Sequence, residues 1–597
     1  MKLLMPFLSK HYLIFTVLIL TCIVSAVLEG MGISLVFPVL QSIVGATSEL
    51  NIPFPFNKVA HLFKDLSLTS LLKAVSIWLL VVTLIKNWFL YLVVIISSRL
   101  RVMVMKYFKG ECINKIMYLG MGYFNKRKGS DFQVIIESHI EFGLGGIIFL
   151  IGNMLVIMFN FLILLILLFL LSWKLTLLSI ALVGSASFGV NILYKKITAV
   201  GKRIVQSKYK QFSALFDIVN GIKLIHLYNR ESFMTKKFHH AINEYNIDVL
   251  KSDRINGLIG PVFEIVSVCI LALLVFIGSY FISSSHQAIM GILLTFIVIL
   301  TRMIPKIKVF NSQLGTLCNR WPTVREIEKF LEGTGEEKLK QGTAQFSYLQ
   351  KNIEFQSIAF SYSPQDSRVF TDLSFQIQKG TKVGIVGLSG SGKSTIVELL
   401  FRFYDPNKGS IYIDGVDLKG IDLRSWRGHI GIVSQDTFLF HDTIKNNISF
   451  SKPYASHDEI IQAAQRANIH NFIANLPNGY DTLVGDRGVL LSGGERQRIS
   501  ISRAILCEPA VLIFDEATSS LDTESEKIVQ KAIEEISINK TVIAIAHRLS
   551  TLTNFDKIVV IKNGHCIEEG THQQLIKKDG LYKKLVEMQT LEKNDAL

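Results

Sequence analysis

Two glycine-bearing stretches could each hold a phosphate group. The first, GLSGSGKST, runs from Gly387 to Thr395 between a strand-like and a helix-like segment, the context that gives G-x-x-x-x-G-K-[ST] its meaning. Its glycines let backbone N–H groups approach phosphates, Lys393 can reach the β and γ phosphates, and the Ser394 hydroxyl can ligate Mg²⁺. The second stretch, LSGGERQ from Leu491 to Gln497, offers N–H groups at a predicted helix N-terminus but has no lysine. The sequence thus has two phosphate-binding elements, and only the first contains a lysine.

Polar residues that follow three other apolar stretches could complete this chemistry. AVLIFDE ends in Asp515 and Glu516, where one carboxylate can hold a magnesium shell and the next can polarise a water. Gln435 follows IGIVS and His547 follows TVIAIA. Taken alone, each of these two could equally be a satisfied polar group at a strand end, the usual role of a lone histidine. Beside the phosphate loop, the set predicts binding and hydrolysis of a nucleoside triphosphate.

In this order and spacing, the motifs resemble the nucleotide-binding domain of an ATP-binding cassette (ABC) protein. The resemblance covers about residues 350 to 590 and includes FDEATSSLD and VGDRG. It implies an α/β P-loop NTPase domain of ABC type, with ATP and Mg²⁺ as cofactors and Tyr362 as the aromatic that stacks on adenine. The implied ATP-binding residues are Tyr362, Gly387, Leu388, Ser389, Gly390, Ser391, Gly392, Lys393, Ser394 and Thr395. The implied metal site is Ser394, Gln435 and Asp515, and the implied catalytic residues are Glu516, His547 and Gln435.

The same resemblance explains the stretch that lacks a lysine. In this family two cassettes dimerise head to tail, and the LSGGE loop of one chain closes on the γ-phosphate held by the other. Here that loop is Ser492, Gly493, Gly494 and Glu495. A helix N-terminus without a lysine binds phosphate weakly by itself, so it contributes only when a partner presents ATP. Glu495 stands where many members have glutamine, a common variant.

The first half of the sequence predicts a membrane domain. The 597 residues are 49% hydrophobic, with a mean hydropathy of +0.38, and the excess lies before about Asn311. Six apolar stretches there approach the about 20 residues that cross about 30 Å of hydrocarbon. They are roughly 13–43, 72–98, 145–171, 175–193, 258–283 and 288–309. The first is too long for a cleavable signal peptide and lacks a small-residue cleavage site.

Lysine and arginine predict the orientation of these spans. The segment 99–141 has eight of them and the segment 195–254 has twelve, whereas the intervening loops have little beyond Lys58, Lys64, Lys73 and Lys174. The positive-inside rule places both long loops, and both termini, in the cytosol of a multi-pass protein of the inner (plasma) membrane. The net charge of +15 is therefore a topology signal, and nucleic acid is not expected as a partner. Six scattered cysteines without a C-x-x-C pair predict neither disulfides nor zinc.

Shorter segments complete the predicted layout. Residues 1–10 are basic and apolar, suited to the membrane surface. Residues Val59, Leu62, Phe63 and Leu66 have a helical spacing that fits an amphipathic external helix or an ordinary packed loop helix. The predicted domains are 1–320, a transmembrane domain with two long cytosolic loops; 321–350, a linker; 351–590, the nucleotide-binding domain; and 591–597, a tail. The two loops are expected to be helical extensions of the spans.

One membrane domain before one cassette resembles an ABC exporter half-transporter, six spans per chain, that pairs to twelve. The resemblance implies short coupling helices near 114–122 and 211–221 that dock on the cassettes. Because every catalytic position has its family residue, a homodimer is favoured over a heterodimer. Importers usually carry the two domains on separate chains, soluble ABC proteins lack spans, and an ATP-gated channel of the same fold stays open. The expected activity is an ATPase coupled to transport by alternating access.

Ionisable residues inside the predicted spans are the clue to the cargo, since each costs roughly 2.5–3.5 kcal/mol there and tends to face a cavity. The substrate-pathway candidates are Lys86, Arg302, Glu29 and Glu264, with Lys306 and Lys308 at the end of the last span. Lys86 could pair with Glu29 or Glu264, or line the cavity and meet a phosphate-bearing head group. An amphipathic external helix after VLEGMGISLVFPVL loosely resembles bacterial flippases of lipid-linked saccharides and exporters of polysaccharide precursors. Lipid or lipid-linked glycan export is expected, with broad hydrophobic drug export as the alternative and peptide export behind both.

Overall fold

The computed structural model describes residues 5–34, 68–282, 287–333, 341–363, 367–515, 523–546 and 548–594. The chain divides into two compact units. The helical unit comprises Met1–Leu119 and Phe124–Glu336, and the sheet unit comprises Gly120–Tyr123 and Glu337–Leu597. The division near residue 336 falls inside the segment 321–350 that the sequence suggests as a linker.

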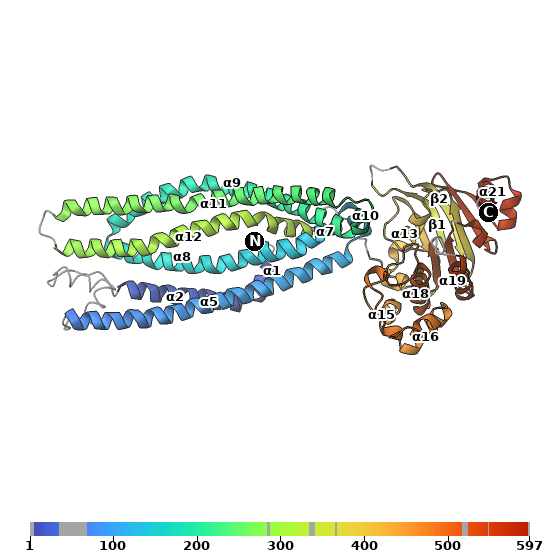
Figure 1. The fold of residues 1–597 in the computed structure, drawn as a ribbon, viewed down its shortest axis with the longest axis horizontal. Coiled ribbons are helices and arrows are strands. Elements are labelled where there is room, and N and C mark those ends of the chain that lie inside the picture. Colours follow the sequence, from blue (N-terminus) through green and yellow to red (C-terminus); the bar gives the residue numbers. More distant parts are fainter. Residues whose placement is uncertain are drawn as a thin grey trace. The chain divides into compact units, whose positions relative to one another are not determined.

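Long helices that run side by side form the helical unit (Figure 1). Their apolar stretches continue into polar, helix-forming sequence, so four of the helices reach 46 to 52 residues, far past the about 20 that a bilayer needs. Pro261, Pro305 and Pro322 lie inside two of these helices without ending them. The long elements are α2 Tyr12–Ser34, α5 Leu68–Tyr118, α8 Gly146–Leu171, α9 Trp173–Asn220, α11 Glu231–Ile282 and α12 Gln287–Glu332. The segments 99–141 and 195–254, predicted to be helical extensions of the spans, are indeed helical for most of their length. A π-helical segment, η2 Val134–Gly145, leads into α8.

Four helices in the described part of the chain are long and apolar enough to cross a membrane. They are Tyr12–Ser34, Leu72–Tyr118, Gly129–Leu171 and Glu231–Leu273. The predicted spans at 175–193 and 288–309 lie in α9 and α12, each of which includes positions outside the described side chains. The proposed external helix at 59–66 also lies outside the described residues. Six spans therefore stay a prediction.

The surface of the helical unit is apolar where a soluble protein would be polar. Trp78, Leu84 and Trp88 on α5 are more than half exposed. Inside, a cluster that includes Leu164, Leu168 and Phe296 is almost fully buried between α8 and α12. Exposed aromatic and aliphatic side chains on a helix of this length are typical of a lipid-facing surface.

Short helices join the long ones at the ends of α5 and α9. They are α6 Met121–Lys126 and α10 Ile222–Leu227. Short coupling helices were predicted near 114–122 and 211–221, and these positions were wrong by several residues. The reason is that α5 and α9 continue to Tyr118 and Asn220, and the short helices begin only after Gly120 and Gly221, which follow these ends. The remaining short helices of this part are α1 Met5–Lys10 and α7 Gly129–Gln133.

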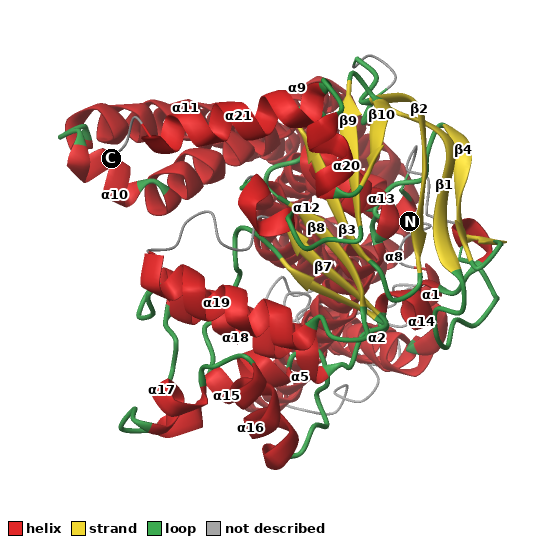
Figure 2. Ribbon diagram, turned by 90° about the vertical axis from the view of Figure 1, so that its right-hand side faces the viewer, coloured by secondary structure: helices red, strands yellow, loops and turns green. Residues whose placement is uncertain are grey.

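The sheet unit holds two sheets (Figure 2). The four-stranded sheet has the order β2-β1-β4-β5 and is antiparallel. The six-stranded sheet has the order β10-β9-β3-β8-β7-β6, and the strands from β9 to β6 are parallel. The strands are β1 Asn352–Phe360, β2 Phe370–Gln378, β3 Lys382–Gly387, β4 Lys408–Ile413, β5 Val416–Asp417, β6 Ile430–Val433, β7 Val511–Asp515, β8 Thr541–Ile545, β9 Lys557–Lys562 and β10 His565–Gly570.

Both faces of the six-stranded sheet are buried, which explains why its strands are continuous apolar runs. Along β7, Leu512 and Phe514 belong to one core, with the helices α18 Gly493–Leu506 and α19 Thr523–Ile536. Val511 and Ile513 belong to the other core, with α13 Lys393–Leu400. This alternation is the period of two of a β-strand. The other helices of the unit are α14 Leu423–Arg427, α15 Ile444–Ser449, α16 His457–Arg466, α17 His470–Ala474, α20 His572–Lys577 and α21 Leu581–Asn594.

Candidate functional site

The carboxyl ends of four parallel strands place the polar candidates along one edge of the sheet. Asp515, the last residue of β7, is in register with Ile545 at the end of β8, and Ile545 is in turn in register with Ile385 of β3. Exposed Gln435 follows β6, which pairs with β7. Glu516 directly follows β7, His547 comes two residues after the end of β8, and both lie outside the described residues. In open parallel sheets, ligands bind at this edge.

The phosphate loop connects β3 to α13 and depends on glycines. Gly390 and Gly392 have φ of 78° and 95°, which side chains other than glycine adopt with strain. A Cβ atom on Gly392 would also lie 2.7 Å from both Val369 and Phe370. A residue with a side chain could therefore replace neither Gly390 nor Gly392 without strain.

The lysine and serine side chains of the loop indicate that it can bind an anion. The Lys393 Nζ atom donates to the carbonyl oxygens of Gly387 at 3.0 Å and Leu388 at 3.1 Å, which holds the ammonium group across the loop. The Ser391 Oγ atom is buried and has no hydrogen-bond partner in the described chain. A buried hydroxyl without a partner is costly unless a ligand satisfies it. The loop thus fits a phosphate, and the exposed Ser394 beside it is free of the core.

Tyr362 is held next to the start of α13. Its hydroxyl donates to the Glu398 carboxylate at 2.6 Å and lies 2.8 Å from the Thr395 hydroxyl. Burial and the Glu398 carboxylate raise the pKa of Tyr362, so the hydroxyl stays a donor. Phe360 and Tyr404 meet the ring edge to face. The ring is nevertheless 39% exposed, so one part of it is available for stacking.

The lysine-free stretch forms the N-terminus of α18 in a capping box. The Ser492 hydroxyl accepts from the Glu495 N–H at 3.4 Å, and the Glu495 carboxylate accepts from the Ser492 N–H at 2.7 Å. The N–H groups of Gly493 and Gly494, the first residues of the helix, have no side-chain cap in the described structure. The carboxylate of Glu495 makes this helix end a weaker anion site by itself than the phosphate loop.

Two further residues of α18 were not singled out from the sequence. Gln497 is buried, accepts from the Thr437 hydroxyl at 2.6 Å and donates to the Ser434 carbonyl at 3.3 Å. Arg503 donates to the carbonyl oxygens of Asn447 at 2.8 Å and Phe438 at 2.9 Å. Both tie α18 to the segment around Gln435. A buried glutamine and a half-buried arginine among the apolar residues of a helix were the signal that could have revealed this connection.

The charged residues of the membrane helices are paired around Glu29. The Glu29 carboxylate on α2 lies 2.7 Å from Lys86 Nζ on α5 and 3.1 Å from Lys306 Nζ on α12. Their side chains are only 11%, 23% and 22% exposed. Of the two predicted roles for Lys86, the ion pair with Glu29 is the observed one. Glu264 pairs with Lys308 at 3.0 Å instead, at an exposed position.

Because Lys86 and Lys306 share the Glu29 carboxylate, removing the carboxylate should lower stability more than removing one of the lysines. Glu29→Gln should leave Lys86 and Lys306 facing each other without a counterion and lower stability by about 1–3 kcal/mol, a range reduced for partial exposure. Lys86→Met should cost less, because Lys306 still neutralises Glu29. Thermal unfolding of the purified protein in nanodiscs measures the difference.

A control variant and a triple variant test this expectation further. Lys308→Met, two residues along α12 from Lys306, removes an exposed pair and should shift the melting temperature little. The triple variant Glu29→Gln, Lys86→Met and Lys306→Met should regain stability over the single Glu29→Gln change. Equal losses for Glu29→Gln and Lys86→Met would contradict a shared carboxylate.

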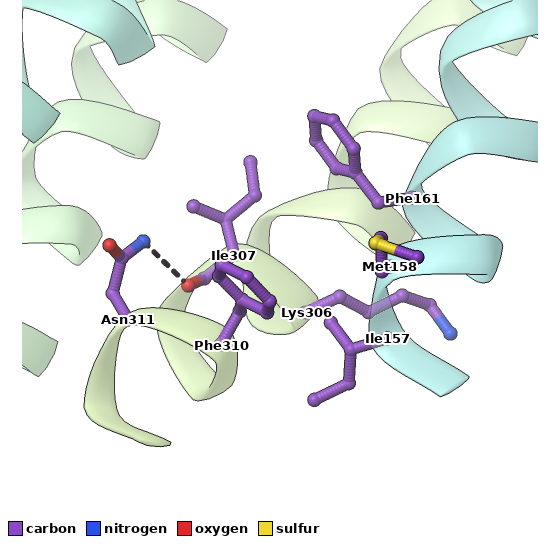
Figure 3. Close-up of a pocket in the computed structure, with 7 residues that line it drawn as sticks. All are labelled: Ile157, Met158, Phe161, Lys306, Ile307, Phe310 and Asn311. Atoms are coloured by element: carbon purple, nitrogen blue, oxygen red, sulfur yellow. Dashed lines mark hydrogen bonds between the residues drawn. The ribbon is translucent and has the colours of Figure 1, made fainter. Parts of the chain in front are cut away.

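Lys306 also lines a cavity between α8 and α12. The cavity has a volume of about 250 Å³, and its other lining residues are Ile157, Met158, Phe161, Ile307, Phe310 and Asn311 (Figure 3). The Lys306 side chain extends beside Met158 and Ile157. Asn311 is held by its own helix, since its Nδ2 donates to the Ile307 carbonyl at 2.9 Å. Apart from this amide, which is bonded to its own helix, the Lys306 ammonium group is the polar group of an otherwise apolar lining. Arg302, a turn earlier on α12, is exposed and has no ion pair among the described residues.

The fold and the phosphate loop define a P-loop ATPase domain attached to a helical membrane domain. The family model "ABC transporter" matches residues 370–519, and "ABC transporter transmembrane region" matches residues 15–304. The chain belongs to the ABC transporter family, as an exporter half-transporter with both domains on one chain.

Named relatives span most of the chain. HepA of Nostoc sp., a heterocyst differentiation ATP-binding protein, is 33% identical over 80% of this chain and 78% of its own. YgaD of Bacillus subtilis, whose name proposes multidrug export, is 33% identical over 79% and 80%. An ATP-dependent lipid A-core flippase of Thiobacillus denitrificans is 36% identical over 70% and 72%. A bacterial Atm1-family ABC exporter solved with ATP bound has a TM-score of 0.81, 26% identity and 98% coverage of both chains.

These findings confirm the predicted fold and activity. The protein has the ABC exporter fold and is an ATPase coupled to transport across a membrane. ATP binding belongs to the matched domain.

Proposed function

We propose that this protein moves a lipid or lipid-linked glycan with an anionic head group from the cytosolic to the outer side of the bacterial inner membrane. The observation that carries the proposal is Lys306, a cation in excess at the Glu29 carboxylate that lines an otherwise apolar cavity. An apolar cavity wall with one ammonium group suits an amphipathic molecule that has acyl chains and a phosphate. The lipid A-core flippases among the relatives support this choice.

The proposed mechanism is alternating access in a homodimer whose cassettes and termini are cytosolic. ATP held at Lys393 of one chain is closed over by Ser492 to Gly494 of the other, and hydrolysis releases the two. Glu516 polarises the attacking water and His547 contacts the γ-phosphate. Ser394, Gln435 and Asp515 would hold Mg²⁺, which supplies charge neutralisation for the phosphates. The bonds of Gln497 to Ser434 and Thr437 support movement of α18 and the Gln435 segment together.

The cargo proposal is tested by removing the excess cation. Lys306→Gln leaves the Lys86–Glu29 pair neutral and intact, so it should fold and yet lose the stimulation of ATP hydrolysis by phosphatidylglycerol or an undecaprenyl-pyrophosphate lipid. Arg302→Gln should weaken the same response. ATPase assays in nanodiscs of stated lipid composition measure it, and Lys308→Gln is the matched control that should keep it.

Broad drug export is the second candidate, which the YgaD relative supports. A cationic hydrophobic drug should be repelled by Lys306, so stimulation by such a drug that rises in Lys306→Gln would favour drug export. Unchanged stimulation by the anionic lipids in both variants would overturn the cargo proposal.

A further inference from the structure

A second cavity lies in the helical unit, separate from the cavity that Lys306 lines. It has a volume of about 260 Å³ and is lined by residues of η2, α9, α11 and α12. Its polar lining residues are Ser138 and His139 from η2, Lys208 from α9, Tyr245 from α11, and Asn319, Arg320 and Thr323 from α12. Four helical elements thus direct polar groups into one space.

The cavity is positively charged. Lys208 and Arg320 are the charged side chains among its lining residues, and no carboxylate lines it. The structure records no ion pair for either cation among the described residues; Lys208 instead lies over the Tyr245 ring at 4.8 Å and the Phe212 ring at 5.3 Å. Burial lowers the pKa of Lys208, and burial with the nearby Arg101 charge lowers the pKa of Arg320. Two partly buried cations without a counterion are a costly arrangement.

Two uncharged groups in the cavity also lack partners. His139 is only 1% exposed, and its Nε2 atom has no hydrogen-bond partner in the described structure. The side-chain oxygen of Asn319 is likewise buried without one. Because the two ends of an amide are interchangeable by rotation, Asn319 can equally present its NH₂ group as a donor. An imidazole in the tautomer that carries its proton on Nε2, an amide and two cations together match the several acceptor oxygens of an oxyanion.

The helices approach closely around this cavity, so it is a formed site rather than a gap. A Cβ atom on Gly201 of α9 would lie 2.5 Å from the Asn319 backbone oxygen, and one on Gly143 of η2 would lie 2.1 Å from the Thr323 hydroxyl. π-Helical segments such as η2 are frequent at functional sites. The polar groups are therefore held by tight packing on both sides.

We infer that this cavity binds a soluble phosphate-type oxyanion and that the bound anion bridges α9 to α12. Lys208 lies well past the predicted span that ends near residue 193, by about 20 Å at about 1.5 Å per helical residue. Arg320 lies about 16 Å past the span that ends near 309 by the same measure. These distances place the cavity beyond the hydrocarbon and favour a soluble anion over a lipid head group. The inference does not depend on the identity of the cargo.

Thermal unfolding of the full chain in nanodiscs tests the inference. The parent is Lys393→Ala, which removes phosphate binding at the phosphate loop. Inorganic phosphate, compared with chloride at equal ionic strength, should raise the melting temperature saturably by about 2 °C or more. Lys208→Met and Arg320→Gln in this background should abolish the rise, and Lys208→Arg should retain it.

The matched control is Lys210→Met, which removes an exposed lysine two residues along α9 that pairs with Glu244 at 2.8 Å, and it should keep the phosphate response. No saturable rise in the parent, or the same rise in Lys208→Met, would overturn the inference. A rise with phosphatidic acid in the nanodisc, but none with inorganic phosphate, would overturn the soluble source. Retained stimulation by anionic lipids in Lys306→Gln would overturn only the proposed function and leaves the phosphate response untouched, so the two failures are distinguishable.

Discussion

Glu516→Gln should lower ATP turnover by about 10²- to 10⁴-fold while ATP binding is retained. The physical reason is position: Glu516 follows Asp515, which ends β7 at the edge where the phosphate loop leaves β3. An amide of the same size cannot polarise a water as a carboxylate does, and it leaves the loop and Lys393 unchanged. Phosphate release by the purified protein measures turnover, and equilibrium binding of a fluorescent ATP analogue measures binding.

A surface carboxylate of the same domain provides the control for this change. Glu534 on α19 is exposed, and Glu534→Gln should leave turnover at the parental value. Turnover near the parental value in Glu516→Gln would remove Glu516 from the catalytic role. Loss of ATP binding in that variant would instead show that the carboxylate serves the nucleotide site as a whole.

A mixed dimer of two inactive chains should recover ATP hydrolysis. Lys393→Ala disables the phosphate loop of one chain. Ser492→Asp keeps a residue that caps a helix well but places a negative charge where a phosphate would approach. If the α18 N-terminus serves the partner's ATP, each homodimer should be inactive, and the mixed dimer should contain one intact site and one site with both defects.

Chains with two different affinity tags allow the mixed dimer to be purified and its ATPase rate compared with both homodimers. Ser492→Asn, which caps the helix without a charge, is the matched control and should lose less activity than Ser492→Asp. A mixed dimer as inactive as the homodimers would mean that the stretch acts on the ATP of its own chain.

The sheet unit could be predicted from its sequence because each local signal agreed with the next. The apolar runs before Gly387 and Asp515 are parallel strands with both faces buried, and the residues after them meet at one edge. The signals for Lys393 and Ser492 are local, since a loop or a cap depends on neighbours in the chain.

The contacts of the helical unit could not be predicted, because they depend on how the helices are rotated against each other. The sequence left two carboxylates as possible partners of Lys86. In the structure Lys86 pairs with Glu29, and Glu29 also pairs with Lys306. Helix period alone shows which residues share a face, but not which faces meet. The same holds for Lys208 and Arg320, which are far apart in sequence and line one cavity.

The place of Glu29 bears on how the chain enters the membrane during synthesis. A lone glutamate or lysine at the middle of a span costs about 2.5–3.5 kcal/mol to insert. Glu29 and Lys86 lie on α2 and α5, the first two long helices to be made, so inserting them as a pair hides both charges from lipid. Lys306 emerges last, on α12, and meets a carboxylate that is already in place. Glu29 thus serves the growing chain twice, first as the counterion of its neighbour and later as the docking point of the final helix.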